Sequence, residues 1–114
     1  MSPGKAGAQA GHAYTDALLN GLASGDPATS RYAALRPGTK VLLGAPLHRL
    51  EEWAFLAECH NIPFAFIVDS GHVEAPDFDG SPTPTALGLG PFDAERPMPP
   101  DLARALRAAR PWPR

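Results

Sequence analysis

Hydrophobic positions along the chain recur with a helical period in some segments and form short unbroken runs in others. Helical spacing or a capping signal marks four predicted helices: residues 3–23, 27–35, 47–59 and a last helix capped by Asp101. Apolar runs bounded by Gly or Pro predict three strands: residues 40–43, 64–68 and 85–91. The segment 64–68 is apolar on both faces, which is typical of an interior strand covered by helices.

The composition is that of one small globular domain. The chain has 114 residues, of which 44% are hydrophobic and 19% charged, and its 14 Pro and 11 Gly predict many turns. No apolar run approaches the roughly 18 residues of a membrane span, and the first residues lack the pattern of a secretory signal. The single Cys59 excludes an internal disulfide, and no paired spacing indicates a metal site. We therefore expect a cytoplasmic protein.

Charge is distributed unevenly, although the net charge is only −2. Residues 58–101 contain eight acids and one Arg, a net charge of −7, whereas residues 102–114 contain four Arg and no acid, a net charge of +4. The sequence pI of about 6.0 excludes a global positive field. Any site for a polyanion such as nucleic acid must therefore be local.

The sharpest candidate feature is a polar stripe on the first predicted helix. At 100° per residue, four polar residues fall within about 60° of one another, opposite an Ala-rich face: Lys5, Gln9, His12 and Asp16. A Lys, an amide and an imidazole on one face supply a cation, a positioning group and a base that titrates near physiological pH. A solvated helix face without chemistry is the alternative interpretation, and the stripe alone favours it.

Two further candidates lie at predicted strand ends. Asp69 follows the apolar run 64–68, at the edge where open α/β sheets bind their ligands, and Gly71 lets the backbone turn sharply after it. Thr85 opens the last strand, where its hydroxyl can bind a substrate carbonyl or phosphate. A turn-forming Asp and a Thr chosen for β-propensity are the structural alternatives.

Four segments in chain order resemble the motifs of one known family. Residues 1–13, which contain Lys5, Gln9 and His12, resemble the first-helix motif of the archaeal and eukaryotic type of peptidyl-tRNA hydrolase. The later segments resemble that family's second strand, its third strand with the turn that follows, and its fourth strand: residues 40–46, 62–72 and 80–91. The order of the motifs makes the resemblance specific, and it covers residues 2–92.

The resemblance implies a three-layer α/β/α domain with a small mixed sheet over residues 1–95. Residues 96–114 depart from the family: a Pro-rich linker and an Arg-rich helix replace its closing helix and terminal hydrophobic segment. It implies hydrolysis of the ester between a nascent peptide and the 3′ ribose of its tRNA, without a metal or cofactor. Motif matching assigns the catalytic residues: Lys5, His12, Asp69 and Thr85. The substrate-binding residues are Gln9, Gly71, His72 and, in a patch for tRNA phosphates, Lys40. The residues alone do not decide which group accepts the proton of the attacking water.

The chain also departs from the family pattern. Val73 stands where the family has Thr, and Met1 falls in the turn that follows the family's first, central strand. Three explanations of the missing first strand stay open: a true start upstream of Met1, a strand from a partner chain, or a rearranged sheet. Because a missing central strand exposes strand edges, we expect a homodimer or a poorly stable chain. The other function classes are an inactive relative that binds tRNA or a protein, and a small dimerisation module.

Overall fold

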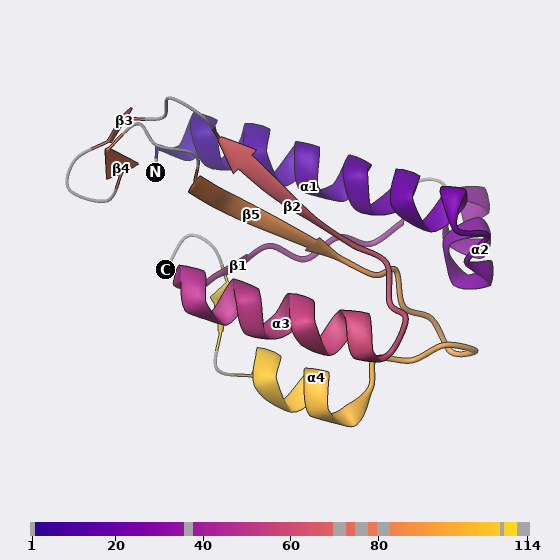
Figure 1. Cartoon of the computed structure of the whole chain (residues 1–114). Coiled ribbons are helices and arrows are strands. Elements are labelled where there is room, and N and C mark those ends of the chain that lie inside the picture. The colour runs from indigo at the N-terminus through magenta and orange to yellow at the C-terminus, as the bar shows by residue number, and fades with distance from the viewer. Residues whose placement is uncertain are drawn as a thin grey trace.

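The structure is a computed structural model that describes residues 2–35, 38–69, 73–74, 78–79, 83–107 and 109–111. Its elements in chain order are α1 (Pro3–Ala23), α2 (Pro27–Leu35), β1 (Leu43–Gly44), α3 (Leu47–Cys59), β2 (Phe64–Asp69), β3 (Val73–Glu74), β4 (Phe78–Asp79), β5 (Thr83–Leu89), α4 (Pro100–Leu106) and β6 (Arg110–Pro111). Figure 1 shows α1 on one side of β2 and β5, with α3 and α4 on the other side. The predicted α/β fold is thereby confirmed.

The boundaries of α1, α2 and α3 agree with the prediction, and side-chain caps set the starts of α1 and α2. The Ser2 hydroxyl accepts a hydrogen bond from the Lys5 amide at 3.2 Å, and Pro3 follows at the first helical position. At the start of α2, the Asp26 carboxylate accepts from the amide and the hydroxyl of Thr29 at 3.0 and 2.6 Å. Within the described ranges, no helix is long and apolar enough to cross a membrane.

The last helix differs from the prediction at both ends. Pro99 precedes α4, and Asp101 lies inside its first turn instead of capping it. The Asp101 carboxylate accepts from the Leu102 amide at 2.8 Å and pairs with the His60 ring at 2.9 Å. α4 ends before Arg110, which the sequence predicts on the helix and which belongs instead to β6.

β2 and β5 pair antiparallel between the helical layers. Phe64 lies opposite Leu89, and the register continues without a break to Ile67 opposite Ala86. α1 packs on one face of this pair and α3 on the other (Figure 1). Both faces of β2 are therefore covered, as predicted. Among the described strands, however, only β5 pairs with β2, so β2 is an edge strand rather than an interior one.

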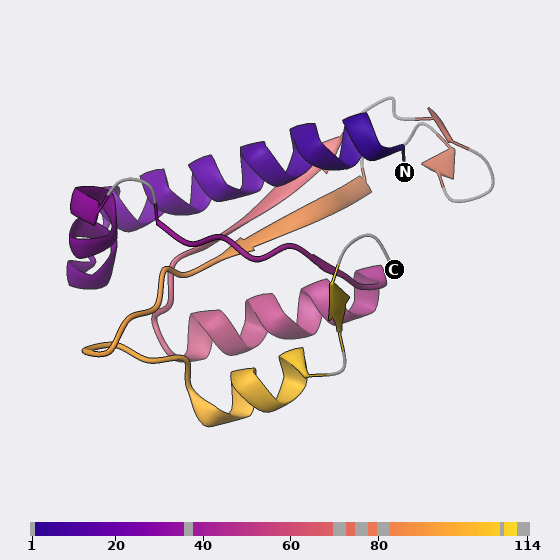
Figure 2. The same cartoon turned by 180° about the vertical axis from the view of Figure 1, so that it is seen from behind.

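The segment predicted as a strand at residues 40–43 is only partly in a ladder. Leu43 and Gly44 form β1, which pairs with β6 and not with β5. Residues 38–46 lie on the far side of β5 from β2, behind β5 in Figure 1 and in front of it in Figure 2. The described strand pairs are all antiparallel, and none of the described strands lies between β5 and residues 38–46.

Small residues bring α1 close to the sheet. Ala13 and Ala17 are buried on the face of α1 that crosses β5 at Gly88. A Cβ at Gly88 would lie 2.8 Å from the Ala13 carbonyl carbon and 3.1 Å from the Ala17 Cβ, so glycine is required for this approach. On the other face, the buried side chains come from α3 and α4: Trp53, Ala54, Ala57 and Leu102.

Candidate active site

The first turns of α1 lie beside the carboxyl end of β2 (Figure 1). The helix and the strand run in opposite directions, so the end of β2 meets the start of α1. This packing brings Lys5, near the start of the helix, to the end of the sheet at which Asp69 closes β2. Candidates from distant parts of the sequence therefore share one end of the molecule.

The predicted polar stripe of α1 is only partly exposed in the structure. Gln9 is only 7% exposed and begins a buried row that continues one turn later with Ala13. His12 and Asp16 are exposed, and Lys5 is half-buried. Lys5 and Gln9 both have interaction partners within the chain. Because Gln9 faces the interior, Lys5 and His12 are the cation and the imidazole of the stripe that reach the surface.

The start of β5 contains a β-bulge that the sequence analysis does not predict. The register with β2 passes from Ala86 directly to Pro84, so Thr85 is the extra residue. Bulges redirect neighbouring side chains and are frequent next to active sites. Pro84 is the sequence signal for this feature, since proline within a strand is confined to edges and bulges.

Part of the predicted site lies outside the described residues. Gly71 and His72 belong to this part, as do the side chains of Asp69 and Thr85, although the backbone of both strand residues is described. The structure therefore brings the first turns of α1, with Lys5, to the backbone of the two strand candidates. His12 lies about 10 Å further along the helix, next to Ala13. Their roles in catalysis stay a prediction.

Lys40 lies apart from the start of α1. Its ammonium group stands over the rings of Tyr14 and Tyr32, 5.9 and 5.5 Å from the two ring centroids. The Tyr14 hydroxyl donates to the Val41 carbonyl at 3.1 Å, which ties this segment to α1. Burial raises the pKa of Tyr14, and the charge of Lys40 opposes this shift. Because Tyr14 lies about 13 Å along the helix from Lys5, the two lysines do not share one compact site.

Two arginine–aspartate pairs hold the segment that follows β5. Arg96 donates to both carboxylate oxygens of Asp26, and Arg31 donates to both of Asp93, at 2.6 and 3.0 Å in each case. The hydrogen bond from Arg31 is the main cause that lowers the pKa of Asp93 to about 2. Burial raises the pKa of Asp26, but hydrogen bonds from Arg96 and Thr29 outweigh burial, and the pKa is lowered. Local sequence patterns do not signal these pairs, whose members are 62 and 70 positions apart.

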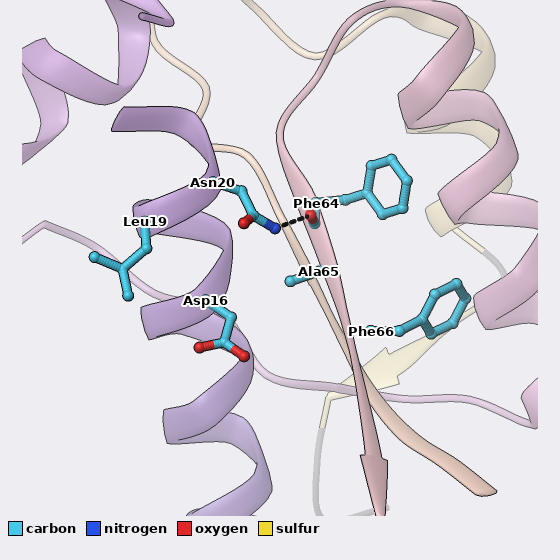
Figure 3. Close-up of a pocket in the computed structure, with 6 residues that line it drawn as sticks. All are labelled: Asp16, Leu19, Asn20, Phe64, Ala65 and Phe66. Atoms are coloured by element: carbon cyan, nitrogen blue, oxygen red, sulfur yellow. Dashed lines mark hydrogen bonds between the residues drawn. The ribbon is translucent and has the colours of Figure 1, made fainter. Parts of the chain in front are cut away.

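A shallow hollow of about 440 Å³ lies between the second half of α1 and the outer edge of β2 (Figure 3). The Asn20 amide donates to the Phe64 carbonyl at 2.9 Å and so pairs one backbone group of this edge. The side chains of Phe64 and Phe66 point toward α3, and that of Ala65 points toward α1 (Figure 3). Asp16 is the charged residue of the lining. The hollow is remote from Lys5 and is not part of the candidate site.

The start of α1 and the adjoining strand ends carry groups suited to ester hydrolysis. The reaction needs an activated water and a positive charge or hydrogen-bond donor for the developing oxyanion. Lys5 can supply the charge, and the exposed imidazole of His12 can accept a proton. In the part of the chain that the structure describes, no three His, Cys, Asp or Glu side chains are grouped to hold a metal ion.

Comparison with known proteins decides the family. A family model described as peptidyl-tRNA hydrolase PTH2 matches residues 1–97. The chain belongs to this family. The matched region of this PTH2 chain includes α1, β2 and β5, whereas α4 and β6 follow it. A search of the curated proteins gives no match. Membership in PTH2 supports, in general terms, a hydrolase that acts on peptidyl-tRNA.

Proposed function

We propose that this PTH2 chain hydrolyses the ester between the peptide and the 3′ ribose of tRNA in peptidyl-tRNA, which releases the peptide and recycles the tRNA. The observation that carries the proposal is the family match over residues 1–97. The position of the first turns of α1 beside the carboxyl end of β2 supports it. The proposed catalytic residues are Lys5, His12, Asp69 and Thr85.

In the proposed reaction, a water oxygen bonds to the ester carbonyl carbon while the water gives up a proton. The bond from this carbon to the ribose oxygen then breaks, and the ribose oxygen takes up a proton. Lys5 stabilises the negative charge that forms on the carbonyl oxygen. His12 accepts the proton from water and returns it to the ribose oxygen. Asp69 holds the Lys5 ammonium group, and Thr85 donates a hydrogen bond to the substrate.

Substrate binding is assigned, within the same proposal, to Gln9, Gly71, His72 and Lys40. Lys40 is exposed, so its charge is accessible to a tRNA phosphate. Gln9 is buried one turn after Lys5, so in this proposal it contributes to binding by orienting the start of α1.

Release of labelled peptide from peptidyl-tRNA by the purified chain tests the proposal. We expect peptide and intact tRNA as products, and a much lower rate for Lys5→Ala. Arg49→Ala is the control, because Arg49 pairs with Glu52 on α3, on the opposite side of the sheet. A folded chain that binds peptidyl-tRNA without releasing peptide would instead identify a non-catalytic relative.

We further propose a cytoplasmic location, since peptidyl-tRNA arises in translation, and a homodimer. The support for a homodimer is the outer edge of β2, where Val68 is 55% exposed and the described strands provide no partner on that side. Open strand edges favour association with another strand.

A further inference from the structure

Both tyrosines of the chain and one lysine form a cluster at its surface. Tyr14 belongs to α1, Tyr32 to α2, and Lys40 to the segment after α2. The Lys40 ammonium group lies over both rings, 5.9 Å from the centroid of Tyr14 and 5.5 Å from that of Tyr32. Lys40 is exposed, and the two tyrosines are half-buried. We call these three residues the tyrosine–lysine cluster.

Backbone contacts hold the two rings in place. The Tyr14 hydroxyl donates to the Val41 carbonyl at 3.1 Å. The Tyr32 ring lies against the backbone of Gly38, where a Cβ would stand 2.7 Å from the Tyr32 hydroxyl oxygen. Rings that are already ordered lose little conformational entropy when a ligand stacks on them. The cluster is therefore a preformed aromatic surface.

The charge of Lys40 selects the sign of a ligand. Its ammonium group donates to the Gly38 carbonyl at 3.3 Å, and no carboxylate among the described residues forms an ion pair with it. Two aromatic rings alone would suit a cation, but Lys40 already occupies that place and repels a second positive charge. The cluster therefore suits an anion that carries a flat aromatic group.

An unpaired nucleotide has both features, a planar base and a phosphate. Proteins bind single-stranded RNA by stacking its bases on aromatic side chains, with cations placed along the backbone. A base that stacks on the Tyr32 ring displaces the ammonium group from that ring. Because the four-carbon stem of Lys40 is flexible, the ammonium group can then pair with the phosphate of the same nucleotide.

The location of the cluster excludes the nucleotide that carries the ester. Tyr14 lies about 13 Å along α1 from Lys5, and the nine positions between them, at 100° each, place the two side chains on opposite sides of the helix. At roughly 3.4 Å per stacked nucleotide, 13 Å corresponds to about four nucleotides. A nucleotide at the cluster therefore contributes to binding and not to the chemical step.

We propose that the tyrosine–lysine cluster binds one unpaired nucleotide of the tRNA part of the substrate, with its base stacked on Tyr32 beside Tyr14 and its phosphate paired with Lys40. The inference rests on the proposed function, which supplies tRNA as the nucleic acid. It adds base stacking, a contact that depends on unpaired RNA, to the phosphate contact already assigned to Lys40.

The test compares two substitutions of Tyr32, with deacylated tRNA as the probe. Tyr32→Leu should weaken tRNA binding by about 5- to 100-fold, which is the usual effect of removing one stacking side chain. Tyr32→Phe is the matched control and should bind within about twofold of the wild type, because it keeps the ring. The slope of log affinity against log salt should not change in Tyr32→Leu, since no phosphate contact is lost.

Two short probes separate base stacking from phosphate binding. They are a hexaribonucleotide of adenosine and the same backbone without bases. The wild type should bind the adenosine probe at least fivefold more tightly, and Tyr32→Leu should bind both probes equally. The chain has only these two tyrosines, so a tyrosine-labelled sample reports on the cluster alone by NMR. Its ring-proton signals should shift with the adenosine probe and much less with the abasic one.

Gly38→Ala replaces Tyr32→Leu if thermal unfolding shows that the latter does not fold. A Cβ at Gly38 meets the outer end of the Tyr32 side chain, which can rotate away, so this variant should displace the ring and weaken tRNA binding in the same way. Equal tRNA affinity for Tyr32→Phe and the variant that removes or displaces the ring would overturn the inference. A wild-type chain that binds neither tRNA nor the adenosine probe, or only the adenosine probe, would overturn it as well.

Failure of this inference and failure of the proposed function give different results. If tRNA binding depends on the Tyr32 ring but no peptide is released, the nucleotide site stands and the hydrolase activity is wrong. If peptide is released from subsaturating peptidyl-tRNA at the wild-type rate by Tyr32→Leu, the activity stands and the nucleotide site is wrong.

Discussion

Gly88 of β5 lies so close to Ala13 of α1 that a Cβ on Gly88 would stand 2.8 Å from the Ala13 carbonyl carbon. The contact joins two backbones, so no flexible side chain can move to relieve it. It sets the distance between α1 and the sheet. It also aligns the helix with the strands, so that Lys5, about two turns before Ala13, lies at the end of the sheet where β2 ends.

Gly88→Ala should therefore destabilise the fold. Overpacking against a fixed backbone typically costs about 1–3 kcal/mol. Gly7→Ala is the matched control, because a Cβ at Gly7 of α1 meets nothing within 4 Å, and Ala within a helix is favoured over Gly by about 0.5–1 kcal/mol. Urea denaturation should show opposite signs for the two variants. Equal shifts in the same direction would contradict this account of the helix–strand contact.

The starts of α1 and α2 could be predicted because each depends on neighbouring residues. Ser2 caps α1 through the Lys5 amide, and Asp26 caps α2 through Thr29. Strand pairing could not be predicted in the same way. The run at 64–68 is apolar on both faces, as in an interior strand, yet its edge position depends on which other segment lies beside it.

In the candidate site, too, some features follow from the local sequence and others depend on tertiary contacts. Helical geometry at 100° per residue places Lys5, Gln9 and His12 on one stripe. The burial of Gln9 follows from the helix rotation that brings Ala13 onto Gly88, which is a tertiary contact. Pairs such as Arg31 with Asp93 join residues 62 positions apart, and no periodic pattern encodes them.

Lys5→Ala should lower the rate of peptide release by about 10²- to 10³-fold, the usual loss on removal of a single group that stabilises an oxyanion. Lys5 lies on the half-buried side of α1 and not in its buried row, so the fold should persist. Single-turnover rates, with circular dichroism as the folding control, measure both effects. A variant that cleaves at the wild-type rate would show that the assigned active site is wrong.

Acid should destabilise the chain between about pH 4 and pH 2. The pKa of Asp93 is lowered from 3.8 to about 2 by Arg31. A lowered pKa in the folded state means that the stabilisation is present above the unfolded pKa and is lost as pH falls through the folded pKa. Arg31→Gln should therefore flatten the dependence of the urea midpoint on pH in this window.

Arg49→Gln is the control for this experiment. Its partner Glu52 lies three positions away on the same exposed helix face, and surface pairs of this kind contribute little. The slope of the urea midpoint against pH should match that of the wild type. If Arg31→Gln also keeps the wild-type slope, the Arg31–Asp93 pair does not contribute to acid stability.

Binding of peptidyl-tRNA should weaken with salt despite the acidic pI, because a local cation patch would contact phosphates. Lys40→Gln should reduce the slope of log affinity against log salt by about 1 if Lys40 contacts one phosphate. Arg104→Gln is the comparison, since Arg104 lies on α4, on the opposite side of the sheet from α1. Affinity that does not change with salt would indicate a protein partner instead of tRNA.

The outer edge of β2 is where we expect two copies to associate. Phe64 and Leu89 form a non-bonded pair, so Phe64 directs its carbonyl outward, where Asn20 donates to it. Phe66 directs its backbone groups the same way. The side chain of Val68, at the end of this edge, is 55% exposed. An antiparallel pairing of two β2 edges would extend the sheet across a twofold axis.

Val68→Lys should shift the chain toward monomer, because a lysine on a strand edge opposes pairing with another strand. Burial of apolar surface contributes roughly 25 cal/mol per Å², so a few hundred Å² covered at this edge approaches the net stability of a small domain. Val41→Lys is the matched control: Val41 is also exposed, at 69%, but lies beyond β5, on the side away from β2. Sedimentation at low micromolar concentration measures both variants. A well-folded wild-type monomer with a high Tm would rule out this association and would mean that the open edge of β2 is stable without a second copy.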